Sequence, residues 1–156
     1  MPPQARAHTG LEIDHATHTI RFVRSFDAPA ELVFEAWTRP EQLRCWWDAA
    51  GGPLAVCEID LRPGGTFRFV SPGHPDMPFT GVYLEIAPPH RLVFEALNST
   101  GRVQFASTGG KTRMTVEIIC RSAEQLEQFL QMGVAAGTSQ TLDNLVAYIQ
   151  RQGVAA

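Results

Sequence analysis

The feature that most constrains the fold is a run of six alternating segments between residues 54 and 121. Apolar side chains recur there at every second position, the period of a strand with one buried face. In one segment this phase places Val82, Leu84 and Ile86 on the buried side. Short turns separate the segments, which predicts an antiparallel meander. With an earlier segment of the same period, the predicted strands number seven, at residues 19–26, 55–61, 66–70, 79–86, 91–97, 102–107 and 111–120.

Two short helices and one long helix complete the predicted pattern. Segments 27–38 and 39–47 each have a proline near their start, continue with an acidic residue and place apolar and aromatic residues on one face. Ser122 is a suitable N-cap for a final helix from about 123 to 150. The predicted fold class is α+β: a seven-stranded antiparallel curved sheet gripping a long C-terminal helix, with two short helices between strands 1 and 2.

Length and composition limit the classes of protein. The 156 residues fit one domain, which we place at 17–152 after a mobile N-terminal tail at 1–16 that has room for a short strand at 11–13. No apolar run approaches the roughly 18 residues of a membrane span, and the N-terminus lacks a signal-peptide pattern. We therefore predict a cytoplasmic protein. A net charge of −3 gives no reason to expect nucleic acid as a partner.

The chain shows no catalytic or metal-binding motif. Its three cysteines, Cys45, Cys57 and Cys120, are widely spaced, which argues against a disulfide framework and predicts reduced, buried thiols. His74 and Asp76 lie in a loop rich in Pro and Gly without a third ligand, which is typical of a solvated turn. The sequence predicts no metal, no cofactor and no catalytic residue.

One charged residue interrupts an apolar face. Arg24 shares the strand phase of Phe22 and Phe26. A buried charge needs a partner, so we predict either an ion pair with a carboxylate or a place near the rim, and favour the ion pair. The other strand carboxylates fall in the water-facing phase and offer no inward acid or base: Glu58, Asp60, Glu85 and Glu95.

Two glycines lie four residues apart in the predicted final helix. Gly133 and Gly137 each cost about 1 kcal/mol relative to alanine inside a helix. The apolar stripe also rotates along this segment, so we expect a bend near the glycines or different faces turned toward the sheet. Small residues here have two interpretations: close packing of the helix on the sheet, or room for a bound molecule.

Five segments, taken in order, carry a resemblance to a known family. They read FDAPAELVFEAWTRPEQLRCWW, CEIDLRPGGTFRF, FTGVYLEIAPPHRLVFE, GGKTRMTVEI and GVAAGTSQTLDNLVAYI. Over residues 17–150 the chain resembles the START-like helix-grip superfamily (SRPBCC), in the branch named after the activator of heat-shock-protein-90 ATPase. The resemblance implies a sheet gripping the last helix, often with a ligand cavity between them. Many relatives carry Trp or Met where this chain has Thr138, so the smaller side chain would enlarge that cavity and add a hydroxyl.

The apolar strands and the small helix residues together predict a binding protein. We expect it to enclose a small apolar or aromatic molecule between sheet and helix. The resemblance adds two alternatives, a cavity enzyme of the polyketide cyclase or dehydratase kind and a co-regulator of a chaperone ATPase; a homodimer is left open. The predicted ligand cavity is lined by Trp37, Trp46, Trp47, Phe67, Phe69, Phe79, Phe94, Phe105, Met114, Gly133, Gly137, Thr138 and Thr141.

Overall fold

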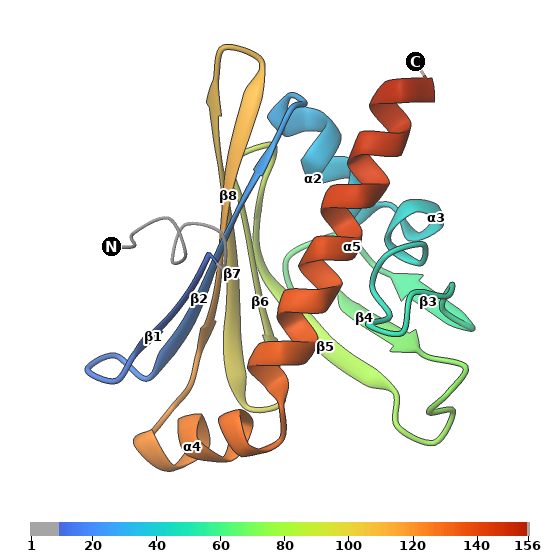
Figure 1. Cartoon of the computed structure of the whole chain (residues 1–156). Coiled ribbons are helices and arrows are strands. Elements are labelled where there is room, and N and C mark those ends of the chain that lie inside the picture. Colours follow the sequence, from blue (N-terminus) through green and yellow to red (C-terminus); the bar gives the residue numbers. More distant parts are fainter. Residues whose placement is uncertain (1–9, 156) are drawn as a thin grey trace.

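The structure, a computed structural model, describes residues 10–155 and shows an antiparallel sheet curved around a C-terminal helix (Figure 1). Neighbouring strands follow the order β1-β2-β8-β7-β6-β5-β4-β3. The sheet is open, since its two ends are the edge strands β1 and β3. The strands are β1 (Leu11–Asp14), β2 (Thr19–Phe26), β3 (Val56–Ile59), β4 (Thr66–Val70), β5 (Phe79–Ala87), β6 (Arg91–Ala96), β7 (Ser99–Thr108) and β8 (Lys111–Ile119).

The predicted fold class is confirmed, but the sheet has eight strands where seven were predicted. The additional strand is β1, which pairs with β2 so that Leu11 lies opposite Phe22 and Ile13 opposite Ile20. β1 falls within the segment 1–16 that was predicted to be a tail, at the place 11–13 where a short strand was allowed. The part of that prediction that concerns residues 1–9 lies outside the described residues.

Helices α2 (Ala30–Thr38) and α3 (Pro40–Leu43) follow β2, as the sequence predicts. The second helix is shorter than predicted, since α3 ends at Leu43 and leaves Trp46 and Trp47 outside it. The final helix predicted at about 123–150 is not continuous, because the chain forms α4 (Ala123–Gln131) and α5 (Val134–Ala155). The break lies at one of the two glycines near which a bend was expected. Ser122 does cap α4, its side chain accepting a hydrogen bond from the Gln125 N–H at 3.1 Å. Gly133 separates the two helices with a φ of +82°, a left-handed conformation that glycine adopts without a Cβ penalty.

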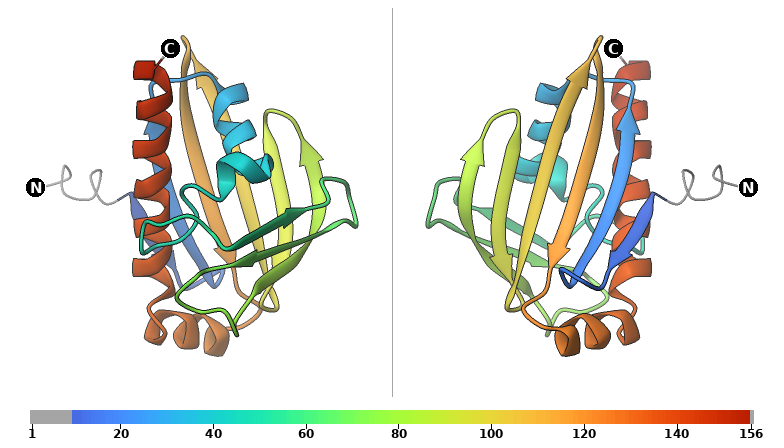
Figure 2. Two further views of the ribbon diagram at one scale, coloured as in Figure 1. Left: turned by 90° about the vertical axis from the view of Figure 1, so that its right-hand side faces the viewer. Right: turned by 90° about the vertical axis from the view of Figure 1, so that its left-hand side faces the viewer.

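Helices α2, α3 and α5 lie on the concave face of the sheet (Figure 2). The convex face carries no helix of the described chain, and α4 crosses below the sheet. Between the sheet and the helices lies an apolar core that draws on almost every element. Its most deeply buried large side chains are Trp46, Phe22, Ile20, Leu43, Leu54, Leu92, Met114, Leu126, Leu142 and Leu145.

The predicted side-chain phase of β5 is wrong over its first half. Tyr83 is only 2% exposed, whereas Val82 and Leu84 are 36% and 46% exposed. The pairing with β6 is irregular between Tyr83 and Glu85. A bulge of this kind inserts one residue and reverses the alternation, which returns Ile86 to the core side. Strict alternation assumed from the sequence therefore fails at this point.

The three cysteines are free, and they differ in burial. Cys120 is buried and Cys57 is half-buried, but Cys45 is exposed, so its predicted burial is wrong. Cys45 lies just beyond α3, and its thiol donates back to the Glu41 carbonyl at 3.4 Å on the solvent side of that turn. Burial raises the pKa of Cys57 to about 11. This thiol therefore stays protonated at neutral pH.

No helix within residues 10–155 is both long and apolar enough to cross a membrane.

Candidate functional site

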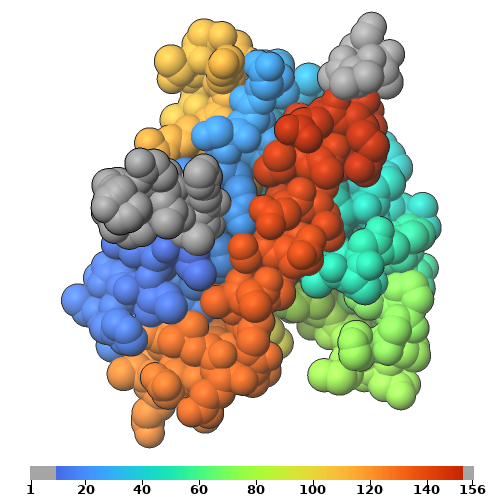
Figure 3. Space-filling model, in the orientation of Figure 1, coloured from blue at the N-terminus to red at the C-terminus, as the bar shows by residue number. Residues whose placement is uncertain are grey.

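A cavity of about 480 Å³ lies between the concave face of the sheet and the first half of α5. Sites for small molecules in proteins commonly occupy about 300–1,000 Å³. In the space-filling view the molecule is hollowed between the start of α5 and the β4–β5 loop (Figure 3). The sheet wall and the helix wall include Phe94, Gly101, Val116, Ile118, Val134, Gly137, Thr138, Thr141 and Leu142.

The helix wall is formed by small residues. A Cβ placed on Gly137 would meet no neighbouring atom within 4 Å, so the missing side chain leaves open space beside the cavity. The hydroxyl of Thr138 makes no hydrogen bond to any residue in the described part of the chain. This geometry favours room for a bound molecule over close packing. Gly133 is exposed and does not border the cavity, so its role is to separate α4 from α5.

The structure brings seven of the predicted lining residues to the cavity wall: Trp37, Trp47, Phe79, Phe94, Gly137, Thr138 and Thr141. Besides Gly133, five others lie in the core. The Trp46 indole donates to the Ala36 carbonyl at 3.0 Å. Met114 sulfur accepts a hydrogen bond from the Trp37 indole at 3.3 Å. The remaining three are Phe67, Phe69 and Phe105.

Those three phenylalanines pack ring to ring. Phe105 meets Phe34 edge-on, with ring centroids 5.6 Å apart. Phe67 and Phe69 stack with centroids 5.0 Å apart. Phe67 and Phe69, but not Phe105, border a separate gap of about 10 Å³, close to the smallest space that holds a water molecule. The Phe69 ring contacts Trp47, and the Phe67 ring contacts Phe79 and Phe94. These two rings therefore support the cavity wall, and none of the three phenylalanines borders the larger cavity.

Hydrogen bonds from α5 fix the loop that follows α3. Thr141 Oγ1 donates to the Trp47 carbonyl at 3.1 Å. The Asn144 side-chain amide donates to the carbonyls of Trp46 at 3.4 Å and Asp48 at 3.0 Å. Because side chains of α5 hydrogen-bond to the backbone carbonyls of this loop, Trp47 and Asp48 are fixed at one side of the cavity.

Several bordering residues were missed by the sequence analysis: Asp48, Ala49, Ala50, Ser71, Ala96, Leu97, Ser99, Gly101, Val116, Ile118, Phe129, Val134 and Leu142. For Asp48, the sequence offered one local indication of a place at the cavity: this residue directly follows Trp46 and Trp47. His74 is an exposed turn residue as predicted, and it also borders the cavity. Among the described residues no group of His, Cys, Asp or Glu could hold a metal ion.

Comparison with known proteins shows which family has this architecture. Residues 27–150 match the family model described as Activator of Hsp90 ATPase homolog 1-like protein. The chain belongs to this family. Curated proteins give no match.

Solved structures share the fold of this family member. Protein Ms6760 from Mycobacterium smegmatis is 27% identical with a TM-score of 0.78, covering 91% of this chain and 97% of that one. Protein NE0264 from Nitrosomonas europaea is 24% identical with a TM-score of 0.78, covering 87% and 96%. The AHSA1-like protein from Aeromonas hydrophila is 24% identical with a TM-score of 0.69, covering 85% and 94%. These likenesses extend over nearly the whole domain.

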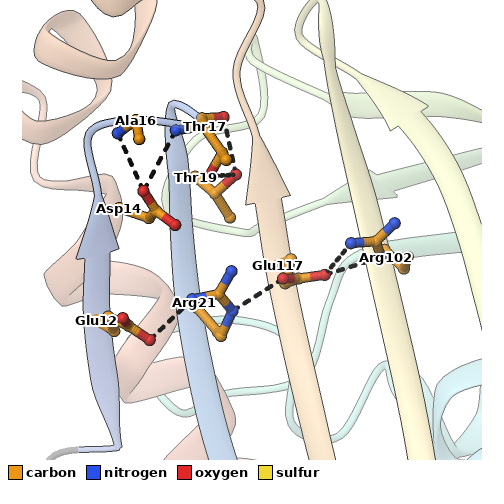
Figure 4. A network of polar contacts seen from close by, with 8 residues as sticks. All are labelled: Glu12, Asp14, Ala16, Thr17, Thr19, Arg21, Arg102 and Glu117. Atoms are coloured by element: carbon orange, nitrogen blue, oxygen red, sulfur yellow. Dashed lines mark hydrogen bonds and ion pairs between the residues drawn. The ribbon is translucent and has the colours of Figure 1, made fainter.

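Glu117 borders the cavity through its strand, but its side chain belongs to a ladder of charges across the sheet (Figure 4). Its neighbours Val116 and Ile118 face inward, so Glu117 faces the convex side. Its carboxylate accepts hydrogen bonds from Arg21 at 2.9 Å and Arg102 at 2.8 Å. Burial raises the pKa of Glu117, but both arginines outweigh it and hold that pKa below its ordinary value. This carboxylate is a structural anion, not an inward acid or base.

Arg24 forms the predicted ion pair, which is confirmed. Its Nε lies 3.0 Å from Asp143 Oδ1, and its side chain is 9% exposed. Arg24 Nη2 also donates to Ser139 Oγ at 2.8 Å. Asp143 and Ser139 do not border the cavity, although neighbouring residues of α5 do. The arginine therefore joins β2 to α5 and keeps the helix in place over the sheet.

Proposed function

We propose that this protein binds a small apolar or aromatic molecule between the sheet and α5, without covalent chemistry. The observation that carries the proposal is the open space beside Gly137 in a cavity of about 480 Å³. Protein interiors pack densely and contain few voids larger than a water molecule. A space of this size, walled by aromatic rings, fits a guest whose apolar surface would be removed from water.

The polar groups at the cavity are few, which suits an apolar ligand with one or two hydrogen-bonding groups. The Thr138 hydroxyl is available, whereas the Ser99 hydroxyl already donates to the Ala96 carbonyl at 2.8 Å. Thr141 donates to the Trp47 carbonyl. Specificity would therefore come mainly from the shape of the apolar wall and from Thr138, Asp48 and His74.

The test is binding of the fluorescent probe N-phenyl-1-naphthylamine to two matched variants. Gly137→Leu places an isobutyl group in open space inside the cavity, and Ala136→Leu places the same group on the exposed side of the same helix. We expect Gly137→Leu to weaken binding at least about ten-fold, or 1.4 kcal/mol, and Ala136→Leu to leave it unchanged. Thermal melting checks that both variants fold. Equal binding by the wild type and folded Gly137→Leu would refute the proposal.

Native mass spectrometry of the purified protein would identify a co-purifying molecule. The cyclase or dehydratase alternative, the chaperone co-regulator alternative, the homodimer and the cytoplasmic location stay predictions.

A further inference from the structure

We infer that the cavity selects neutral or cationic aromatic molecules over carboxylates and other anions, and that Asp48 sets this preference. The inference names a ligand class for the site and so rests on the proposed function.

The charges around the cavity are unbalanced. Asp48 and Glu117 are the acidic residues that border it, and no lysine or arginine of residues 10–155 does so. Glu117 is neutralised on the convex face by Arg21 and Arg102. The carboxylate of Asp48 has no such cation, and no ion pair to it exists within the described chain. Apart from His74, which is exposed and also borders the cavity, the ionisable residues of the wall are therefore acidic. An anionic ligand would meet the unpaired carboxylate of Asp48.

Asp48 is held in place but not saturated. Its Oδ1 accepts the Ala50 N–H at 2.9 Å, and its backbone carbonyl accepts from Asn144 at 3.0 Å. Its second carboxylate oxygen receives no hydrogen bond from the described residues. That oxygen can accept one from a ligand donor. Like charges repel more strongly beside an apolar wall than in water, so the same group disfavours anions.

The rings of the wall act in the same direction. Aromatic faces carry partial negative charge and attract cations. Trp47 precedes Asp48 in the chain, and its ring centroid lies 5.4 Å from that of Phe79 and 6.2 Å from that of Trp37. Phe94 and Phe129 also border the cavity. A positively charged or donor group near Trp47 would meet these rings, with Asp48 adjacent to Trp47 in the chain.

One feature opposes this preference. The N-terminus of α5 borders the cavity at Val134, and a helix N-terminus carries about half a positive charge. The Asp48 backbone carbonyl accepts a hydrogen bond from Asn144. Asn144 lies ten residues beyond Val134, or about 15 Å along the helix. The partial positive charge of the helix N-terminus is therefore smaller than the full charge of the Asp48 carboxylate. It also lies about 15 Å along the helix from the turn that holds Asp48. Without the carboxylate, the helix end would favour anions.

The experiment compares two probes that share one skeleton. N-phenyl-1-naphthylamine is neutral, and 8-anilino-1-naphthalenesulfonate is the same molecule with a sulfonate. Probe fluorescence is assigned to the cavity only if it is present in the wild type and lost in the Gly137→Leu variant. Asp48→Asn removes the charge and keeps an acceptor for the Ala50 N–H. The control, Asp76→Asn, removes a like charge from the exposed β4–β5 loop outside the cavity wall.

In the wild type and Asp76→Asn we expect the neutral probe to bind at least about ten-fold more tightly than the sulfonate. In Asp48→Asn we expect this ratio to fall by at least about three-fold, because the sulfonate binds more tightly. Equal affinities in the wild type, or a ratio that Asp48→Asn leaves unchanged, would overturn the inference and leave the proposed binding function intact. Absence of cavity binding by the neutral probe would instead overturn the proposed function.

Discussion

Alanine substitutions at the two glycines of the C-terminal segment should change stability in opposite directions. Gly133 joins α4 to α5 with a φ of +82°. Gly137 lies inside α5, where its N–H donates to the Gly133 carbonyl at 2.9 Å. A Cβ at either position would contact no neighbouring atom within 4 Å. Backbone conformation alone therefore decides the sign of each effect.

The magnitudes follow from the two conformations. An alanine in the left-handed region costs about 1–2 kcal/mol relative to the right-handed one, so Gly133→Ala should lower the free energy of unfolding by about 1 kcal/mol or more. Alanine in a helix is about 0.8–1 kcal/mol better than glycine, so Gly137→Ala should raise it by that amount. The two variants should differ by about 2 kcal/mol, or roughly 4–8 °C in melting temperature for a domain of this size.

The assay is urea denaturation of the wild type and both variants, followed by circular dichroism. Equal m-values would establish that the native and unfolded states expose similar surface in all three proteins. Two stabilised variants, or two destabilised variants, would refute the reasoning. Such a result would show that Gly133 does not hold a left-handed conformation, or that Gly137 is not helical.

Three further predictions concern other parts of the molecule. Because its arginines lower the pKa of Glu117 below the ordinary 4.5, this group stabilises the fold fully above that pH and loses the effect as pH falls through its lowered pKa. Glu117→Gln should therefore cost on the order of 2 kcal/mol at pH 7 and distinctly less at about pH 3 in urea denaturation; a pH-independent difference would contradict this. Gly101→Ala should cost about 1–3 kcal/mol, because its Cβ would overlap the ring of Phe94; unchanged stability would show that the ring moves aside freely. Thr138→Trp should abolish binding of N-phenyl-1-naphthylamine in a protein that still melts cooperatively, and retained binding would exclude Thr138 from the ligand site.

Local sequence was enough to predict most elements. The segments at 19–26 and 66–70 coincide with β2 and β4, and Ser122 caps a helix as predicted. Alternation, proline positions and caps act through neighbouring residues, so they can be read without knowing the fold. The rotating apolar stripe indicated a bend near Gly133 but not a complete break of the helix. The bulge after Tyr83 was missed because the strand pattern continues across it. At each, the path of the chain is set by what it packs against.

The identity of the site residues was only partly determined by sequence. The apolar aromatic residues were recognisable as interior, but Trp46 and Trp47 are adjacent and have different roles: one is sealed in the core, and the other borders the cavity. Asp48 and His74 joined the site through loops that are distant from α5 in the sequence. Periodicity determines which side chains leave water. Whether a buried side chain meets another side chain or an open space depends on how the sheet curves and where α5 crosses it, and only the tertiary structure decides that.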